Sequence, residues 1–357
     1  MNIQILDLAN PLWTQTLEKL KHDVYHLPEY VYLEAQRTQS IAEAILINEG
    51  EKIFFLPYLL RRCDDILDNH LTTLEVFDVV SPYGYPGLLI NQAACHTPDF
   101  LNQALQQLKT VFSTKNVCSA FLRLHPILNH YVQEFLPPED YKIQGETVSI
   151  DLTLSEADLW HQTRSAHRTH INKCKRAGFI AKVVDYDDYL NDFISIYHQT
   201  MDRVEAKNNF YFNQEYFTGL SNLNNKIHLC IVELENQIAC ASIFTECCEI
   251  VQYHLGGTNN DFLKLAPNKL MIDYMRLWAK RRGNKVLHLG GGVGSAKDSL
   301  YHFKAGFSQQ RHTFLVVRLI IDAEKYFNLV QLRAKELKKS PEVFYQSNFF
   351  PAYRSFS

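Results

Sequence analysis

Three short segments in the second half of the sequence place glycine, aromatic and basic residues at spacings that suit an anion or a reacting carbonyl. They are His254-Leu-Gly-Gly-Thr258, Leu287-His-Leu-Gly-Gly-Gly292 and Ser299-Leu-Tyr-His-Phe-Lys-Ala-Gly-Phe307. The first two close predicted strands, where glycine allows a bulge and the close approach of a ligand. Gly256, Gly257 and Thr258 are therefore candidate substrate-binding residues. A tight turn that needs a positive φ is the alternative explanation of the two glycines.

Lys304 is the candidate catalytic side chain of the third segment. It lies between two aromatic residues shortly after the glycine run. Its ammonium can face the same site and balance a phosphate or a developing oxyanion. A lysine on the solvated face of a helix is the simpler alternative.

Tyr253 and His254 are the candidate proton-transfer residues of the strand that precedes the first glycine pair. Neighbouring residues of a strand point to opposite faces, so one of the two should face the site. An imidazole can take a proton from an amine, and a phenol can donate one to a leaving group. Two buried aromatic residues with a structural role are the alternative.

Gly290, Gly291 and Gly292 follow a predicted strand and precede a short helix. In that context backbone N–H groups can receive a phosphate or a carboxylate, so the three glycines are candidate substrate-binding residues. The segment lacks the Gly-Lys-Ser/Thr of a nucleotide-binding P-loop. It also lacks the glycine spacing of a dinucleotide-binding fingerprint.

A basic segment precedes these motifs. Residues 158–178 read as one long helix that ends at Gly178, and Arg164, Arg168 and Lys175 should share one face of it. A solvated basic face is the default interpretation. The alternative is contact with the phosphates of a nucleotide-sugar acceptor or of a tRNA, for which Arg168 is the best single candidate.

The first half of the chain offers a weaker group of candidate substrate-binding residues. Tyr83 and Tyr85 flank a glycine in the turn Ser81-Pro-Tyr-Gly-Tyr-Pro-Gly87. An aromatic turn at a strand end can form the wall of a pocket. Arg37 and Arg123 are placed to bind an anion near it.

One order of elements occurs twice and positions these residues. A hairpin, a third strand, a Pro-initiated helix and a fourth strand are expected in each half. This order predicts duplication of one α/β unit with a mixed sheet. The first copy comprises residues 45–48, 53–60, 74–80, 98–108 and 120–124, and the second comprises residues 227–234, 238–244, 250–255, 267–278 and 285–289.

Composition bounds the function. The chain has 357 residues, 46% hydrophobic and 21% charged, which suits a two-domain globular protein. With a net charge of −3 it is no general binder of polyanions, and no DNA partner is expected. Eight cysteines without a C-x-x-C pair, and no leader or long apolar run, predict reduced thiols in a cytoplasmic protein. The scattered histidines imply no metal site.

The three segments, together with Arg168-Thr-His-Ile-Asn-Lys-Cys-Lys-Arg-Ala-Gly178, resemble the Fem family of peptidoglycan-bridge aminoacyltransferases and its acetyltransferase-like relatives in the GNAT superfamily. The resemblance implies an α/β fold of two tandem GNAT-like domains, each a mixed sheet flanked by helices. We expect domains at residues 1–145 and 146–323, followed by a helical tail at 324–357. It also implies that Lys304 belongs to the active site and that Arg168 matches the arginine that opens the family's helix motif.

The resemblance implies an N-acyltransferase in cell-wall biogenesis. It would move an aminoacyl or acyl group onto an amine of a small, lipid-linked or nucleotide-linked cell-envelope precursor, held between the domains, with peripheral membrane contact as an option. No tightly bound cofactor is expected, and the donor is either an aminoacyl-tRNA or an acyl-coenzyme A. The segment Lys264-Leu-Ala-Pro-Asn-Lys269 lacks the glycines of the usual coenzyme A loop. An acetyltransferase of amino sugars or small amines, and a non-catalytic binding protein, are the alternatives.

Overall fold

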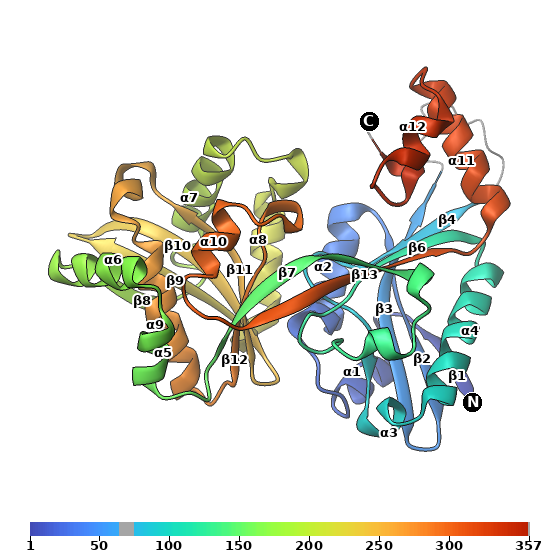
Figure 1. Ribbon diagram of the computed structural model, residues 1–357, viewed down its shortest axis with the longest axis horizontal. Helices are drawn as coiled ribbons and strands as arrows, with labels where there is room; N and C mark the ends of the chain where they lie inside the picture. The colour runs from blue at the N-terminus through green and yellow to red at the C-terminus, as the bar shows by residue number, and fades with distance from the viewer. Residues whose placement is uncertain (64–74, 356–357) are drawn as a thin grey trace. The chain divides into compact units, whose positions relative to one another are not determined.

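The chain folds into two compact units, shown in the computed structural model of Figure 1. The structure describes residues 1–63 and 75–355. Unit 1 comprises Met1–Gln144 and Phe314–Ser357, and unit 2 comprises Gly145–Thr313. The sequence analysis places residues 314–323 in the second domain and residues 324–357 in a separate tail. The structure groups both with unit 1, because a strand near the end of the chain completes the sheet of that unit.

The sheet of unit 1 has six strands in a row. Their order is β1 (Asn2–Leu6), β2 (Ile41–Glu49), β3 (Lys52–Arg62), β4 (Phe77–Val80), β6 (Val117–Arg123) and β13 (Arg311–Ile320), and β5 (Leu89–Ile90) pairs with β3. Among the described strands of this unit, only β4 and β6 run parallel, and helix α4 (Pro98–Thr114) crosses between them. The predicted third strand begins at Leu74, which lies outside the described residues. The other helices are α1 (Pro11–Leu17), α2 (Pro28–Thr38), α3 (Gln92–Cys95), α11 (Ala323–Glu336) and α12 (Pro341–Gln346).

The sheet of unit 2 repeats this arrangement. Its order is β8 (Ile180–Val184), β9 (Ile227–Leu234), β10 (Gln237–Cys247), β11 (Ile250–Thr258), β12 (Val286–Gly290) and β7 (Tyr141–Asp151). Only β11 and β12 run parallel, and α9 (Asn268–Arg281) crosses between them. The other helices are α5 (Glu156–Gln162), α6 (Ser165–Arg176), α7 (Leu190–Arg203), α8 (Gln214–Leu220) and α10 (Ser299–Lys304).

The last strand of each sheet comes from an unexpected part of the chain. β7 pairs antiparallel with β12, although it precedes every other element of unit 2 in the sequence. β13 pairs antiparallel with β6, although it follows unit 2 in the sequence. Each hairpin, crossover helix and parallel pair forms as the repeated order predicts. The source of the closing strand is decided by pairing between distant segments, which local patterns do not report.

The crossover helices carry the apolar face that packs on each sheet. In α4 the buried residues recur at helical spacing, and the same holds in α9. They include Phe100, Leu101, Ala104, Leu105 and Leu108 in unit 1, and Leu270, Met271, Met275 and Ala279 in unit 2. Burial of these faces fixes the strand ends that carry the motifs.

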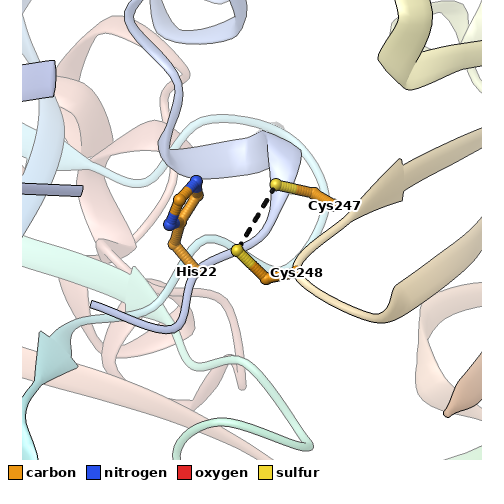
Figure 2. Close-up of side chains that lie close together, drawn as sticks. All are labelled: His22, Cys247 and Cys248. Carbon is orange, nitrogen blue, oxygen red and sulfur yellow. Dashed lines mark hydrogen bonds between the residues drawn. The ribbon is translucent and has the colours of Figure 1, made fainter. Parts of the chain in front are cut away.

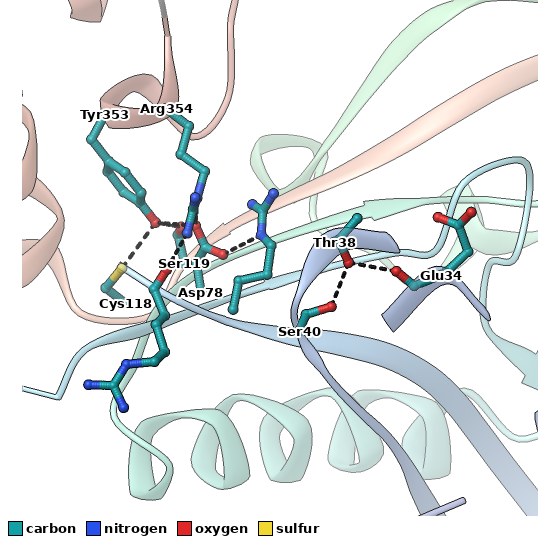
Figure 3. Close-up of polar contacts among 10 residues, drawn as sticks. Glu34, Thr38, Ser40, Asp78, Cys118, Ser119, Tyr353 and Arg354 are labelled. Carbon is teal, nitrogen blue, oxygen red and sulfur yellow. Dashed lines mark hydrogen bonds and ion pairs between the residues drawn. The ribbon is translucent and has the colours of Figure 1, made fainter. Parts of the chain in front are cut away.

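The C-terminal segment is anchored to unit 1 by a buried carboxylate. Asp78 on β4 is fully buried and accepts from Arg61 over 2.8 Å and from the Tyr353 hydroxyl over 3.2 Å. Arg354 forms an ion pair with the same carboxylate (Figure 3). The Tyr353 hydroxyl also contacts Ser119 over 2.7 Å. The C-terminal segment is therefore part of the packed structure of unit 1.

The predicted long helix at residues 158–178 is two helices, so that prediction is wrong in detail. α5 ends at Gln162 and α6 begins at Ser165. The buried Arg276 on α9 donates to the Leu159 carbonyl over 2.9 Å and to the Thr163 hydroxyl over 2.6 Å. These contacts satisfy the end of α5, where the chain turns. Among the described residues, no helix has the length and apolar character needed to cross a membrane.

Candidate functional site

The parallel strands of unit 2 pair over only part of their length. Their register runs from Ile250 opposite Val286 to Gln252 opposite His288. β11 continues to Thr258 and β12 to Gly290. The two glycine motifs therefore lie at the ends of adjacent strands, beyond the paired part. A gap of this kind between parallel strands is where ligands reach backbone groups in open α/β sheets.

A β-bulge interrupts β11 within the first motif. Leu255 pairs with Ile243 and Tyr253 pairs with Phe244, so His254 is the extra residue. Bulges re-aim side chains and are frequent next to active sites. The sequence predicts an irregularity at Gly256 and Gly257, and the bulge lies just before them.

Lys304 enters the site from the end of α10. Its side chain is buried, with 7% of the residue exposed, and Nζ donates to the Gly291 carbonyl oxygen over 2.7 Å. Nζ also lies 5.7 Å from the centre of the Tyr253 ring. Burial lowers the pKa of Lys304 to about 8, and the charge of Asp298 opposes that shift. In the described part of the chain no carboxylate is within ion-pair distance of this ammonium, so the buried cation remains available to a negative charge on a substrate.

The structure brings Tyr253 to Lys304 and directs His254 elsewhere. The Tyr253 ring packs against Phe244, with ring centres 5.4 Å apart. Burial raises the pKa of Tyr253, so its phenol holds a proton near neutral pH. His254 Nε2 lies 3.5 Å from the Tyr216 hydroxyl on α8. Of the two proton-transfer candidates, Tyr253 is therefore the one beside Lys304.

Gly257 and Thr258 serve the packing of α7. A side chain on Gly257 would lie 2.6 Å from the Ile196 carbonyl oxygen. The Thr258 N–H donates to the Thr200 hydroxyl over 3.0 Å, and Arg203 donates to the Thr258 carbonyl over 3.1 Å. Only a glycine allows the helix to approach β11 this closely. These contacts explain both residues without a substrate.

The glycine run at the end of β12 forms a tight loop that is held by hydrogen bonds to a side chain of the same segment. Gly290 has a φ of 75°, which favours glycine. A side chain on Gly291 would lie 2.8 Å from the Glu146 carbonyl oxygen, and one on Gly292 would lie 2.2 Å from the Asp298 carboxylate. Asp298 accepts from the N–H groups of Val293 and Tyr301 over 3.0 and 2.8 Å. Part of the loop's N–H capacity is therefore taken by its own carboxylate.

The backbone N–H groups of the segment before α9 donate to acceptors of the same segment. It forms a short 3₁₀ helix, Asn260–Leu265, and the N–H groups of Phe262, Ala266 and Lys269 donate to nearby backbone carbonyls. The Asp261 N–H donates to the Asn259 side chain over 3.1 Å. Each of these four N–H groups therefore already has an acceptor close to it in the sequence.

Arg168 and Lys175 have different surroundings on α6. Lys175 pairs with Asp273 over 2.8 Å. The partly exposed Arg168 guanidinium forms no hydrogen bond or ion pair with another residue of the described segments. Arg168 is therefore a basic side chain of this helix whose charge is available to a partner.

In unit 1 the four candidates surround the end of β4. The Tyr83 N–H donates to Glu34, which also pairs with Arg37 over 2.7 Å. The Tyr85 ring packs against Phe314 at 5.2 Å between ring centres. Burial raises the pKa of Tyr83 to about 12 and lowers the pKa of Arg123. The Arg123 guanidinium forms no ion pair or hydrogen bond within residues 1–63 and 75–355, so its donors are available to an anion.

Three residues that contribute to these sites were not identified from the sequence. Asp298 holds the glycine loop, Glu34 orients Arg37 and the Tyr83 turn, and Phe244 supports Tyr253. An aspartate three residues before Tyr301 is the usual signal of a helix N-cap, so Asp298 was detectable. Glu34 and Phe244 act across long sequence separations and carry no local signal.

All eight cysteines are free thiols in the structure. Cys247 ends β10 and Cys248 begins the turn to β11, and their Sγ atoms lie 4.0 Å apart (Figure 2). That separation is about twice the length of an S–S bond.

Comparison with known proteins supports the assignment of this geometry. The family model of the acetyltransferase (GNAT) domain matches residues 161–304, from α5 to Lys304. Residues 161–304 therefore match a GNAT-type acyltransferase domain. The repeated topology of the two units makes the fold a tandem of GNAT-like domains, each with a mixed sheet. No curated protein sequence matches the chain closely enough to count as a relative.

Two solved structures show the same fold over most of the chain. The crystal structure of FemX has a TM-score of 0.68 at 13% identity, and the match covers 90% of this chain and 98% of FemX. A conserved protein of unknown function from Bacteroides thetaiotaomicron VPI-5482 has a TM-score of 0.53 at 11% identity, covering 89% of this chain and 99% of that protein. At these identities the likeness concerns the fold. The resemblance to the Fem-like layout is therefore confirmed at that level.

Proposed function

We propose that this protein is an N-acyltransferase that moves an aminoacyl group from an ester donor to the amine of an anionic cell-envelope precursor. The observation that carries the proposal is the buried Lys304 ammonium, held by the Gly291 carbonyl beside the Tyr253 ring. A buried cation without a carboxylate partner is energetically unfavourable and is typical of a functional site. Negative charge that develops on a substrate would compensate it.

In this reaction the amine attacks the ester directly, without a covalent enzyme intermediate. The main task of the enzyme is to stabilise the negative charge that develops on the carbonyl oxygen. The neutral amine attacks the ester carbonyl carbon, the C–N bond forms, and the C–O bond to the leaving group breaks. The Lys304 ammonium stabilises the oxyanion, and the Tyr253 phenol is placed to give its proton to the leaving oxygen. The proton that the amine loses restores the phenol, so the net transfer is one proton from nitrogen to oxygen.

The segment before α9 favours an aminoacyl ester over acyl-coenzyme A. The N–H groups of Asp261, Phe262, Ala266 and Lys269 are engaged within the segment. A pyrophosphate at this place would have to displace those hydrogen bonds. An aminoacyl-tRNA has no pyrophosphate next to its ester, so it does not need that loop.

Unit 1 supports an acceptor that carries a negative charge. The Arg123 guanidinium lies near Tyr83 at the end of the parallel strands, and both pKa values are shifted by burial. Arginine binds phosphate groups through a planar set of donors. A nucleotide-linked or lipid-linked precursor offers such a phosphate together with the amine.

Acyl-coenzyme A is the second candidate donor, because the matched family model is that of an acetyltransferase domain. α9 also begins without a side-chain cap, and the N-terminus of a helix attracts phosphate. In this case the acceptor would be an amino sugar or another small amine.

A donor-swap assay tests the proposal. The purified chain is incubated with a mixture of labelled aminoacyl-tRNAs or with labelled acetyl-coenzyme A, each with a nucleotide-linked peptidoglycan precursor that bears a free amine. We expect the aminoacyl label on the precursor, and loss of transfer in Lys304→Met. Lys182→Met changes a lysine at the sheet edge of unit 2 and is the matched control. Transfer of acetyl alone would establish the second candidate, and no transfer from either donor would refute the proposal.

A further inference from the structure

The bulge in β11 brings together two residues that a regular strand would separate. Residues two apart share a face of a strand, so residues three apart do not. The extra residue His254 resets this alternation, because Tyr253 pairs with Phe244 while Leu255 pairs with Ile243. Tyr253 and Gly256 therefore lie on the same face, although three positions separate them.

The missing side chain of Gly256 leaves room for two hydroxyl groups. A Cβ atom at Gly256 would lie 2.2 Å from Ser242 Oγ and 2.5 Å from the Tyr253 phenol oxygen. Ser242 on β10 stands directly opposite Gly256 in the sheet and is 2% exposed. Both hydroxyl oxygens face the same space, and the Ser242 hydroxyl lowers the pKa of Tyr253. Gly256 thus makes space for a hydroxyl pair beside the Lys304 site.

We propose that Ser242 is a positioning residue that fixes the Tyr253 phenol over Gly256 and supports it as the proton donor to the leaving oxygen. The inference rests on the proposed function for the identity of the proton acceptor. Ser242 touches neither donor nor acceptor in this role and acts through Tyr253.

The position of the Ser242 hydroxyl suits the proton transfer from Tyr253 to the leaving oxygen. When Tyr253 has given its proton to the leaving oxygen, the phenolate oxygen needs a donor, and the Ser242 hydroxyl lies next to it. The Ser242 hydroxyl lowers the pKa of Tyr253, against the larger effect of burial. Ser242 therefore favours release of the proton, and the proton lost by the amine then returns to the phenolate.

Titration of the phenol tests the inference without any substrate. The protein is labelled with [ζ-¹³C]tyrosine, and the Tyr253 signal is assigned by its loss in Tyr253→Phe. We expect Ser242→Ala to raise the pKa of Tyr253 and Ser242→Thr to restore it, because threonine keeps the hydroxyl. Ser149→Ala is the matched control, since Ser149 is fully buried in β7 of the same unit and hydrogen-bonds His312 over 2.6 Å. It should leave the Tyr253 titration unchanged.

Turnover provides the second readout. With the donor found by the swap assay, Ser242→Ala should lower kcat by on the order of 10-fold to 10²-fold with little change in KM, because a displaced donor group affects the chemical step. If Ser242→Ala does not fold, Gly256→Ala separates the same hydroxyl pair and takes its place. An unchanged Tyr253 titration in these variants overturns the positioning role. A shifted titration in a protein that transfers neither donor overturns the proposed function and, with it, the proton-donor role.

Discussion

The two units share one topology but differ in the hydrogen bonding at the end of their parallel strands. In unit 1 the pairing of β4 and β6 is extended past the strands. Ser81 N–H donates to Phe121 over 3.1 Å, Arg123 N–H to the Ser81 hydroxyl over 2.8 Å, and Gly87 N–H to Arg123 over 2.8 Å. In unit 2 the register of β11 and β12 ends at Gln252 and His288, and Lys304 enters beyond it.

Charge compensation follows the same division. The buried carboxylates of unit 1 have cationic or histidine partners, as Asp78 with Arg61 and Asp23 with His125. Unit 2 also pairs its buried Arg276 with Asp273. Lys304 contacts no carboxylate among the described residues, although only 7% of the residue is exposed. Lys304 is thus a buried charge without a carboxylate partner, and the proposed function rests on this feature of unit 2.

Asp78→Asn should produce the largest loss of stability in unit 1. The change leaves Arg61 and Arg354 without their shared charge, and breaking a buried pair costs about 3–5 kcal/mol. The loss in the free energy of unfolding is measured by urea unfolding, monitored by hydrogen exchange in peptides from unit 1. Glu75→Gln removes the exposed partner of Arg62 and should cost less than about 1 kcal/mol. Equal losses in the two variants would contradict the comparison.

Lys304→Met should reduce turnover about 10²-fold to 10³-fold, equivalent to about 3–4 kcal/mol of transition-state stabilisation. The reason is the loss of the ammonium that balances the oxyanion. Initial rates of the purified variant with the donor identified above provide the measurement. Wild-type rates in this variant would remove Lys304 from the mechanism.

The same substitution should increase stability, in contrast to Asp78→Asn. The folded-state pKa of Lys304 is about 8, below the ordinary value of 10.5. Below pH 8 the lysine is charged in both states and burial of the charge opposes folding by on the order of 3 kcal/mol. Between pH 8 and 10.5 the folded state is neutral, so this penalty disappears as pH rises. Wild type should therefore gain stability relative to Lys304→Met over that range, as denaturation at several pH values would measure. A constant difference would indicate an ordinary solvated lysine.

Gly257→Ala and Gly256→Ala should separate packing from positioning on the same strand. The new methyl group at Gly257 meets the backbone oxygen of Ile196, which cannot move freely, so we expect a loss of about 1–3 kcal/mol. The methyl group at Gly256 meets two side-chain hydroxyls that can turn away. Its stability loss should be the smaller one, with the Tyr253 titration altered instead. Thermal unfolding of both variants makes the comparison.

Much of the fold could be predicted from the sequence, because it depends on the local spacing of apolar residues. The apolar positions of α4 from Phe100 to Leu108 recur at helical intervals, and the hairpins alternate around short polar turns. The break between α5 and α6 at Thr163 could not be predicted from the sequence. It depends on Arg276, which lies on a helix more than a hundred residues later in the chain. Residues 314–320 could not be assigned to unit 1 for the same reason, since their partners lie on β6.

The sequence by itself determined that the chain contains a repeated α/β unit, where its glycine motifs stand, and that Lys304 follows them within one short helix. Only the tertiary structure decided what those residues face. Gly257 is fixed by its approach to α7, while Gly256 makes room for Ser242 and Tyr253. Lys304 is buried rather than solvated because α10 directs its side chain to the Gly291 carbonyl. The physical reason is that spacing sets which residues lie on one face of one element, whereas desolvation and charge compensation depend on the elements that pack against it.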